Sequence, residues 1–225
     1  MHRVCDIVGD LERTLEVLAL DPVLVDWARH QPDLRQAWER CDRGDWLLQI
    51  ATRVAVPRRL VVQAAVDCAG MSLGRIPREE FRPRRALHLA SAWVRGEASG
   101  SECWAHGFAA ANAAGELEET TGSARANDAA MAAACAAFAC DADADCSYYA
   151  QRAHAAQAAF LAACAFDDEV IRAHRLAASI VRDRVPFHAI HERIDSAVRD
   201  SELPPPGPTM HEDALYAFAL GYGES

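Results

Sequence analysis

Three alternating aspartates, Asp141, Asp143 and Asp145, offer oxygen ligands at the spacing with which a calcium-binding loop begins. Such a loop needs a glycine at its sixth position for a sharp turn, and Cys146 stands there. It also needs a bidentate glutamate at its twelfth position, where the chain has Arg152. The run therefore predicts a solvated acidic turn and no metal site.

Two histidines one helical turn apart, His188 and His191, are followed by Glu192. They could hold a metal ion if His174 or Asp168 supplied a third ligand. The order lacks the His-Glu-x-x-His pattern of zinc hydrolases, so we expect two surface or half-buried histidines. A metal- or thiol-dependent enzyme that uses this pair and a cysteine stays open as an alternative.

The eight cysteines form no local motif, because no two are separated by only two residues, as zinc knuckles and thioredoxin-like sites require. The chain also has no glycine-rich phosphate loop, nucleophile elbow or dinucleotide fingerprint. Its first residues are charged and lack the long apolar run of a secretory signal. We therefore expect a cytoplasmic protein with reduced thiols, no cofactor, no metal and no catalytic site.

The charge of the chain is uneven. All 23 basic residues are arginine, and the net charge is −10. Residues 1–115 hold 15 arginines and 15 acids, whereas residues 116–225 hold 8 arginines and 18 acids. A phosphate-binding surface needs a basic face, so this pattern disfavours nucleic acid and anionic membranes as ligands. It suits a basic protein partner, although an acidic face that only keeps the protein soluble explains it equally.

The composition predicts an all-α fold. Alanine, the best helix former, accounts for 47 of the 225 residues. Apolar residues recur at three- and four-residue spacing along most of the chain. We expect a multi-helix array of about ten helices with short loops and a C-terminal helix joined by a proline-rich linker.

Proline and glycine divide this array into three predicted parts. Residues 1–75 would form an N-terminal helical lobe, 76–201 an alanine-rich helical array, and 202–225 a proline-rich linker with a short helix. The segment 72–82, which contains glycine, proline and several charges, is the expected connection between the first two parts.

Several helix ends can be placed from local signals. Pro83 opens a helix, and Gly96 is a plausible residue for its end. Ser99 and Glu102 have the spacing of a capping box that starts the next helix. The polar segment 116–127 is expected to be a helix end and a loop.

The alanine-rich tract from residue 129 to 166 predicts two helices joined near the acidic run. Asp167, Asp168 and Glu169 follow it at the start of another predicted helix. Acids are favoured there because the positive end of the helix dipole lies at the N-terminus.

Four short stretches together carry a family resemblance: residues 41–47 (CDRGDWL), 67–69 (DCA), 82–86 (RPRRA) and 92–97 (AWVRGE). Their order, ahead of an alanine-rich tract, resembles the alanine-rich, all-helical immunity proteins of bacterial polymorphic toxin systems. The similarity covers roughly residues 37–165. It implies a protein that neutralises a toxin by tight binding and performs no chemistry of its own.

An acidic face and a few residues of the familiar stretches are the expected partner contacts. These residues are Asp141, Asp143, Asp145, Asp167, Asp168, Glu169, Asp45, Arg84 and Arg95. Electrostatic attraction to a basic toxin domain would speed binding to such a face.

The familiar residues also have a purely structural interpretation. Trp93 would anchor its helix against Trp46 or Trp104. Arg95 with Glu97 would brace the turn that follows that helix. A further alternative is a helical scaffold or regulatory adapter that forms homo-oligomers through the C-terminal helix.

Overall fold

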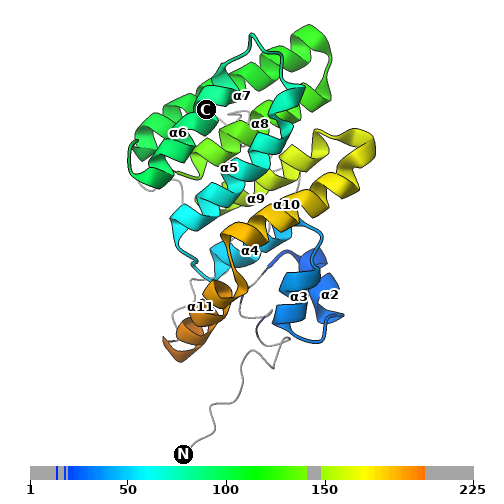
Figure 1. The fold of residues 1–225 in the computed structure, drawn as a ribbon, viewed down its shortest axis with the longest axis vertical. Helices are drawn as coiled ribbons and strands as arrows, with labels where there is room; N and C mark the ends of the chain where they lie inside the picture. The colour runs from blue at the N-terminus through cyan, green and yellow to red at the C-terminus, as the bar shows by residue number, and fades with distance from the viewer. Residues whose placement is uncertain (1–13, 15–17, 19, 141–147, 201–225) are drawn as a thin grey trace, which may run out of the picture.

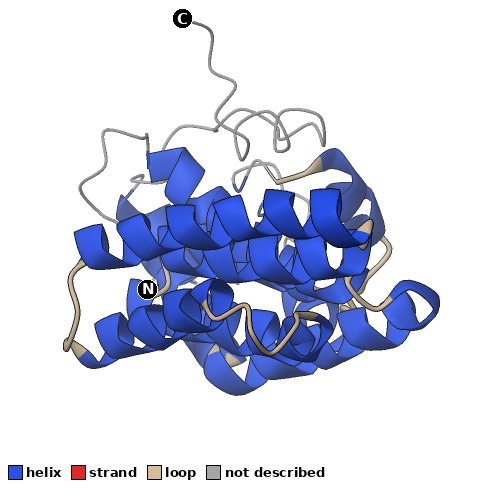
Figure 2. Cartoon of the chain, turned by 90° about the horizontal axis from the view of Figure 1, so that it is seen from above, coloured by secondary structure: helices blue, strands red, loops and turns tan. Residues whose placement is uncertain are grey.

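The computed structural model describes residues 14, 18, 20–140 and 148–200. Ten α-helices and two short 3₁₀ helices account for most of these residues, and this part of the chain contains no strand (Figures 1 and 2). The predicted all-α class is confirmed. The apolar periodicity before residue 20 and the predicted helix after the proline-rich linker fall largely or wholly outside the described residues.

The elements follow one another with short connections. They are α2 (Pro22–Arg29), α3 (Leu34–Arg40), α4 (Gly44–Arg53), α5 (Arg58–Ser72), η2 (Leu73–Arg75), α6 (Arg82–Arg95), α7 (Gly100–Thr121), α8 (Ala124–Phe138), α9 (Tyr148–Cys164), η3 (Asp167–Glu169), α10 (Val170–Arg184) and α11 (Phe187–Asp200).

Helices α4 to α10 build the main array and run along roughly the same diagonal in Figure 1, with α2, α3 and α11 below them. Helix α7 packs against α6 and α8, and α9 packs against α4, α5 and α8. Helix α10 covers α4 and α5. One core of buried residues runs from Leu18 to Ile194, across the sequence boundary predicted between residues 75 and 76.

Helix α8 lies inside this array because its side chains are small. From Ala129 to Phe138 every residue is buried, so all sides of this stretch touch other helices. A helix that is apolar all round is expected in such a central position. None of the described helices is both long enough and apolar enough to cross a membrane.

The predicted signals at the ends of α6 and α7 are confirmed. Helix α6 begins at Arg82 with Pro83 in its first turn, and Gly96 ends it in the left-handed conformation at φ 82°. The side chain of Ser99 accepts a hydrogen bond from the Glu102 backbone N–H, and Glu102 accepts one from the Ser99 backbone N–H. This reciprocal pair satisfies two donors that the helix itself leaves unpaired.

The polar segment 116–127 contains a helix end and a loop, as predicted, but the loop is only two residues long. Helix α7 continues to Thr121, and Gly122, with φ 62°, and Ser123 separate it from α8. The polar residues Glu118 to Thr120 are exposed on this last turn, while Leu117 is buried beneath them. Most of the polar composition therefore belongs to a solvated helix face.

Trp93 does not pack against either predicted tryptophan. Its ring lies beside the Arg58 guanidinium, with the carbon at the centre of that group 5.5 Å from the ring centroid. Trp46 pairs with Trp27 at 5.6 Å between ring centroids. Trp104 packs against a phenylalanine of α8. The three tryptophans therefore stabilise three separate helix contacts, which spacing along the chain could not distinguish.

Candidate protein-binding surface

The connections after α5, α7 and α9 meet at one side of the array (Figure 1). Arg125, in the first turn of α8, forms an ion pair with Asp167 of η3. The Arg75 guanidinium of η2 lies over the ring of Phe166, 4.7 Å from its centroid. These contacts join segments that are about 40 to 90 residues apart in the sequence.

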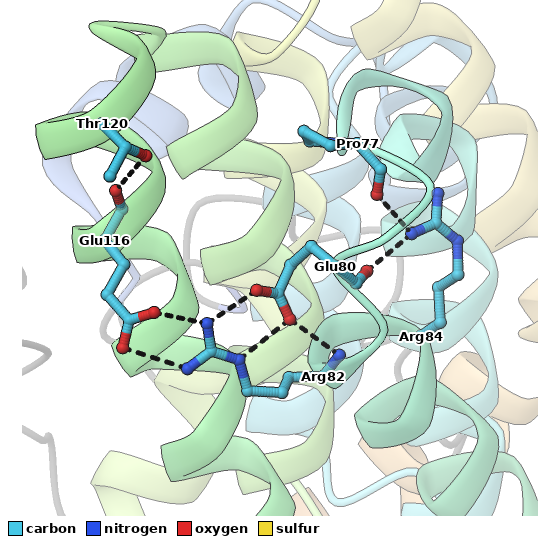
Figure 3. A network of polar contacts seen from close by, with 6 residues as sticks. All are labelled: Pro77, Glu80, Arg82, Arg84, Glu116 and Thr120. Carbon is cyan, nitrogen blue, oxygen red and sulfur yellow. Dashed lines mark hydrogen bonds and ion pairs between the residues drawn. The ribbon is translucent and has the colours of Figure 1, made fainter.

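Arg82 links the start of α6 to the end of α7 through two carboxylates (Figure 3). Its guanidinium donates to Glu80 at 2.6 and 2.9 Å and to Glu116 at 2.5 and 3.1 Å. The hydrogen bonds from Arg82 hold the pKa of Glu80 and of Glu116 below their usual range. Both carboxylates are therefore ionised at neutral pH, and together they exceed the charge of the arginine between them.

Arg84 clamps the connection that precedes α6 (Figure 3). Its guanidinium donates to the carbonyl oxygens of Leu73, Ile76, Pro77 and Glu80 at 2.8 to 3.2 Å. All of these acceptors belong to the chain's own backbone. The geometry therefore supports a structural role for this half-buried arginine, which the sequence placed among the partner contacts.

Asp128 lies among other acids at the start of α8. Neighbouring Asn127 donates from its side-chain amide to Glu118 at 2.6 Å, which holds that glutamate beside α8. Burial, followed by the negative charges of Glu118 and Asp167, raises the pKa of Asp128 to about 6. Asp128 therefore lies in a locally negative environment, which the ion pair between Arg125 and Asp167 only partly offsets.

Replacing Asp128 with asparagine should make the protein more stable at alkaline pH. A raised pKa means that the folded chain holds this proton more tightly than the unfolded chain does. Protonated Asp128 therefore stabilises the folded wild type relative to ionised Asp128. This stabilisation is complete below the pKa of the unfolded chain, about 4, and is lost as the pH rises through about 6. We expect the free energy of unfolding of Asp128→Asn to exceed that of the wild type by about 1 kcal/mol at pH 8, after allowance for solvent screening. At pH 5 the difference should be much smaller.

Urea unfolding of both proteins at pH 5 and pH 8 measures this difference. The matched control is Asp183→Asn, which removes an exposed carboxylate near the other end of α10. If the difference in the free energy of unfolding between Asp128→Asn and wild type does not increase from pH 5 to pH 8, the expectation is wrong.

We define the acidic end as the acids carried by these connections and the helix turns beside them. They are Glu79, Glu80, Glu116, Glu118, Glu119, Asp128, Asp167, Asp168 and Glu169. The same segments, residues 73–85, 116–128 and 166–172, contain seven arginines, so nine acids against seven arginines leave a net charge of −2. Seven of the nine acids are exposed, and the other two are half-buried.

Of the six acids in the predicted acidic face, the structure describes Asp167, Asp168 and Glu169. All three are exposed members of the acidic end. The acidic run at 141–145 lies outside the described residues.

Asp45, also predicted to contact a partner, lies inside the protein where α4 crosses α10. Arg43 donates to its carboxylate at 2.8 and 2.6 Å, and the His174 Nδ1 atom is 3.7 Å from it. The Arg43 guanidinium also lies near the rings of Trp46 and Phe160. With 5% of its surface exposed, Asp45 is placed to position this helix crossing and not to touch a partner.

Arg95 lies at the other end of α6 from the acidic end. It is exposed and donates to Glu97 at 2.8 Å, across the turn at Gly96, as its structural interpretation predicts. An exposed pair of this kind contributes little to stability. Its position places it about 20 Å from Arg82 along the helix axis, so it is not part of the acidic end.

The histidine pair on α11 gains no third ligand in the described part of the chain. His174 faces Asp45, and Asp168 lies beyond the opposite end of α10. No three His, Cys, Asp or Glu side chains among the described residues are arranged to hold a metal ion. Burial raises the pKa of Cys41 and of Cys135 to about 12, so these two side chains are neutral thiols at pH 7.

Six members of the acidic end did not appear among the sequence-predicted contacts. They are Glu79, Glu80, Glu116, Glu118, Glu119 and Asp128. They come from three separate elements, and their proximity depends on how these elements pack. One local signal was available: three acids in four residues, 116–119, just before the glycine that ends α7.

Fold and surface together define an all-helical protein with a braced, anionic end exposed to solvent. The chain belongs to the family described as Imm-5 like putative immunity protein, whose model matches residues 54–168. No curated protein and no solved structure matches the chain.

The family match confirms the resemblance seen in the sequence and changes its limits. It covers α5 to α9 and continues into η3, so every acid of the acidic end except Glu169 falls within it. It begins at Val54 and therefore leaves out the stretch 41–47, which is part of the resemblance seen in the sequence. In the structure that stretch supplies the buried contact between Arg43 and Asp45.

Proposed function

We propose that this chain is an immunity protein that neutralises a toxin by direct, non-enzymatic binding, and that the acidic end is its contact surface. The observation that carries the proposal is the position of this surface within the residues that define the family. The expected partner is a basic toxin domain, because nine acids against seven arginines leave this end negative.

The structure of the acidic end suits rapid binding. Arg82 and Arg84 hold its largest connection in one conformation, so little ordering remains to be done when a partner binds. Most of its carboxylates are exposed, and such charges act mainly on the rate of association. Salt is expected to slow association for the same reason.

Co-expression with toxin domains encoded beside this gene tests the proposal directly. Each toxin domain is produced in a sensitive host with and without this chain, and complexes are then isolated by affinity purification. Rescue of growth together with a stoichiometric complex is the expected result. If none of these toxin domains is bound or neutralised, the proposed function is wrong.

Charge reversal at the acidic end should slow association with the toxin domain recovered in that test. The double variant Asp168→Arg and Glu169→Arg changes the charge by +4 at exposed positions, so we expect the fold to be retained. A small loss of stability is expected, because the acids at the start of α10 and the ion pair between Glu169 and Arg172 are removed. We expect the association rate constant to fall about 10-fold at low salt, with a smaller change in the dissociation rate. Stopped-flow fluorescence or surface plasmon resonance measures both rate constants.

The matched control carries the same change in charge elsewhere. Asp183→Arg with Glu192→Arg reverses two exposed acids near the end of α10 and on α11. A drop of similar size in both double variants would show that only the overall charge matters and would remove the acidic end as the contact surface.

A further inference from the structure

Phe81, immediately before α6, is the most exposed of the large apolar side chains in the described part of the chain. It has 69% of its surface exposed, whereas Phe108, another exposed phenylalanine, has 49%. Burying a phenylalanine side chain typically stabilises a protein by about 1.5 to 3 kcal/mol. Phe81 contributes little of this stabilisation, because most of its side chain is exposed.

The backbone around Phe81 is fixed on both sides. Before it, Arg84 holds the carbonyl oxygens of Pro77 and Glu80 at 3.0 and 2.8 Å. After it, the Arg82 backbone N–H donates to the Glu80 carboxylate at 3.0 Å, and Pro83 is buried at the start of α6. The Phe81 side chain therefore stays in solvent because the loop that carries it cannot turn it inward.

The surroundings of Phe81 carry charges of both signs. Glu79 and Glu80 precede it in the chain, and the bridge from Arg82 brings Glu116 to the same site, while Arg78, Arg84 and Arg85 also lie within four positions of it. Glu79 and Glu116 are exposed, and Glu116 keeps 59% of its side-chain surface accessible. An exposed aromatic side chain on a fixed backbone is suited to act as the anchor of a binding surface.

We propose that Phe81 is the apolar anchor of the acidic end, and that it enters an apolar pocket on the toxin. The proposal rests on the proposed function and adds the chemistry of the partner surface. The occupant follows from the charge of the acidic end as a whole, whose nine acids outnumber its seven arginines and suit a basic partner. Because the loop is already fixed, Phe81 loses little conformational freedom on binding.

The test compares Phe81→Ala, Phe81→Leu and a matched control against the toxin domain recovered by co-expression. We expect Phe81→Ala to raise Kd about 100-fold, mainly through faster dissociation, and Phe81→Leu to have an intermediate effect. The control is Val23→Ala on α2, an apolar side chain of similar exposure, 66%, on the opposite side of the molecule (Figure 1). It should leave Kd unchanged.

The outcomes separate this inference from the proposed function. A wild-type protein that binds no neighbouring toxin overturns both. If the wild type binds a toxin domain and Phe81→Ala binds it with the same Kd, only the role of Phe81 as anchor is overturned. Sedimentation of the chain alone examines self-association: a dimer that Phe81→Ala abolishes would assign the anchor to a second copy and overturn the toxin pocket.

Discussion

Replacing Gly44 with alanine is expected to destabilise the protein by about 3 kcal/mol, the upper range for adding one methyl group to a packed site. A Cβ atom at Gly44 would lie 2.7 Å from the Ala177 Cβ and 2.8 Å from the Ala177 carbonyl carbon. The second of these atoms belongs to the backbone of α10, so no rotation of a side chain relieves the clash. The two helices would have to separate at the crossing that holds Asp45.

Urea unfolding of Gly44→Ala measures the loss, and Gly115→Ala supplies the control. Gly115 lies inside α7, and a Cβ placed there meets no atom within 4 Å. Alanine is the better helix former, so this second variant should gain up to about 1 kcal/mol. If Gly44→Ala and Gly115→Ala changed the free energy of unfolding equally, the close approach of α4 and α10 would not limit stability.

Arg84→Ala should cost about 3 kcal/mol, because it removes charge-assisted hydrogen bonds to four backbone carbonyls at once. The buried residue Ile76, which holds the same connection to the core, would lose its neighbouring support. Chemical denaturation gives the change in stability. We also expect Arg84→Ala to weaken toxin binding, since the loop carrying Phe81 would no longer be fixed.

Arg85→Ala is the matched control, because Arg85 is the next residue along α6 and its side chain is exposed. The substitution removes the same charge and is expected to change stability by less than about 0.5 kcal/mol. An equal loss in the two variants would mean that the charge of this region, and not the clamp of Arg84 on the backbone, stabilises the connection.

The sequence specified the helices well because their ends depend on local chemistry. Pro83, Gly96 and the pair Ser99 and Glu102 act within a few residues of themselves, and each of these predictions is confirmed. The segment 116–127 does contain the predicted helix end and loop, but polarity alone does not separate a solvated helix face from a loop and so could not give the length of either. Only the two residues between α7 and α8 leave the helical conformation.

The candidate surface was much harder to predict, because it is a property of packing. Asp167, Asp168 and Glu169 could be selected as a run, but the link from Arg82 to Glu116 joins residues 34 positions apart. A carboxylate is also equally polar in the sequence whether it faces solvent or an internal arginine. Asp45 shows this, since its carboxylate is buried against Arg43.

The acidic end is built only from connections and helix termini, each belonging to a different part of the chain. A bound toxin would therefore hold the ends of α6, α7, α8 and α10 against one another, although it would not touch the buried stretch of α8 from Ala129 to Phe138. Local unfolding of the buried part of α8 requires the neighbouring helix ends to separate. Backbone amide hydrogens of the alanine-rich interior should consequently exchange with deuterated solvent more slowly in the complex, far from any residue that the toxin contacts.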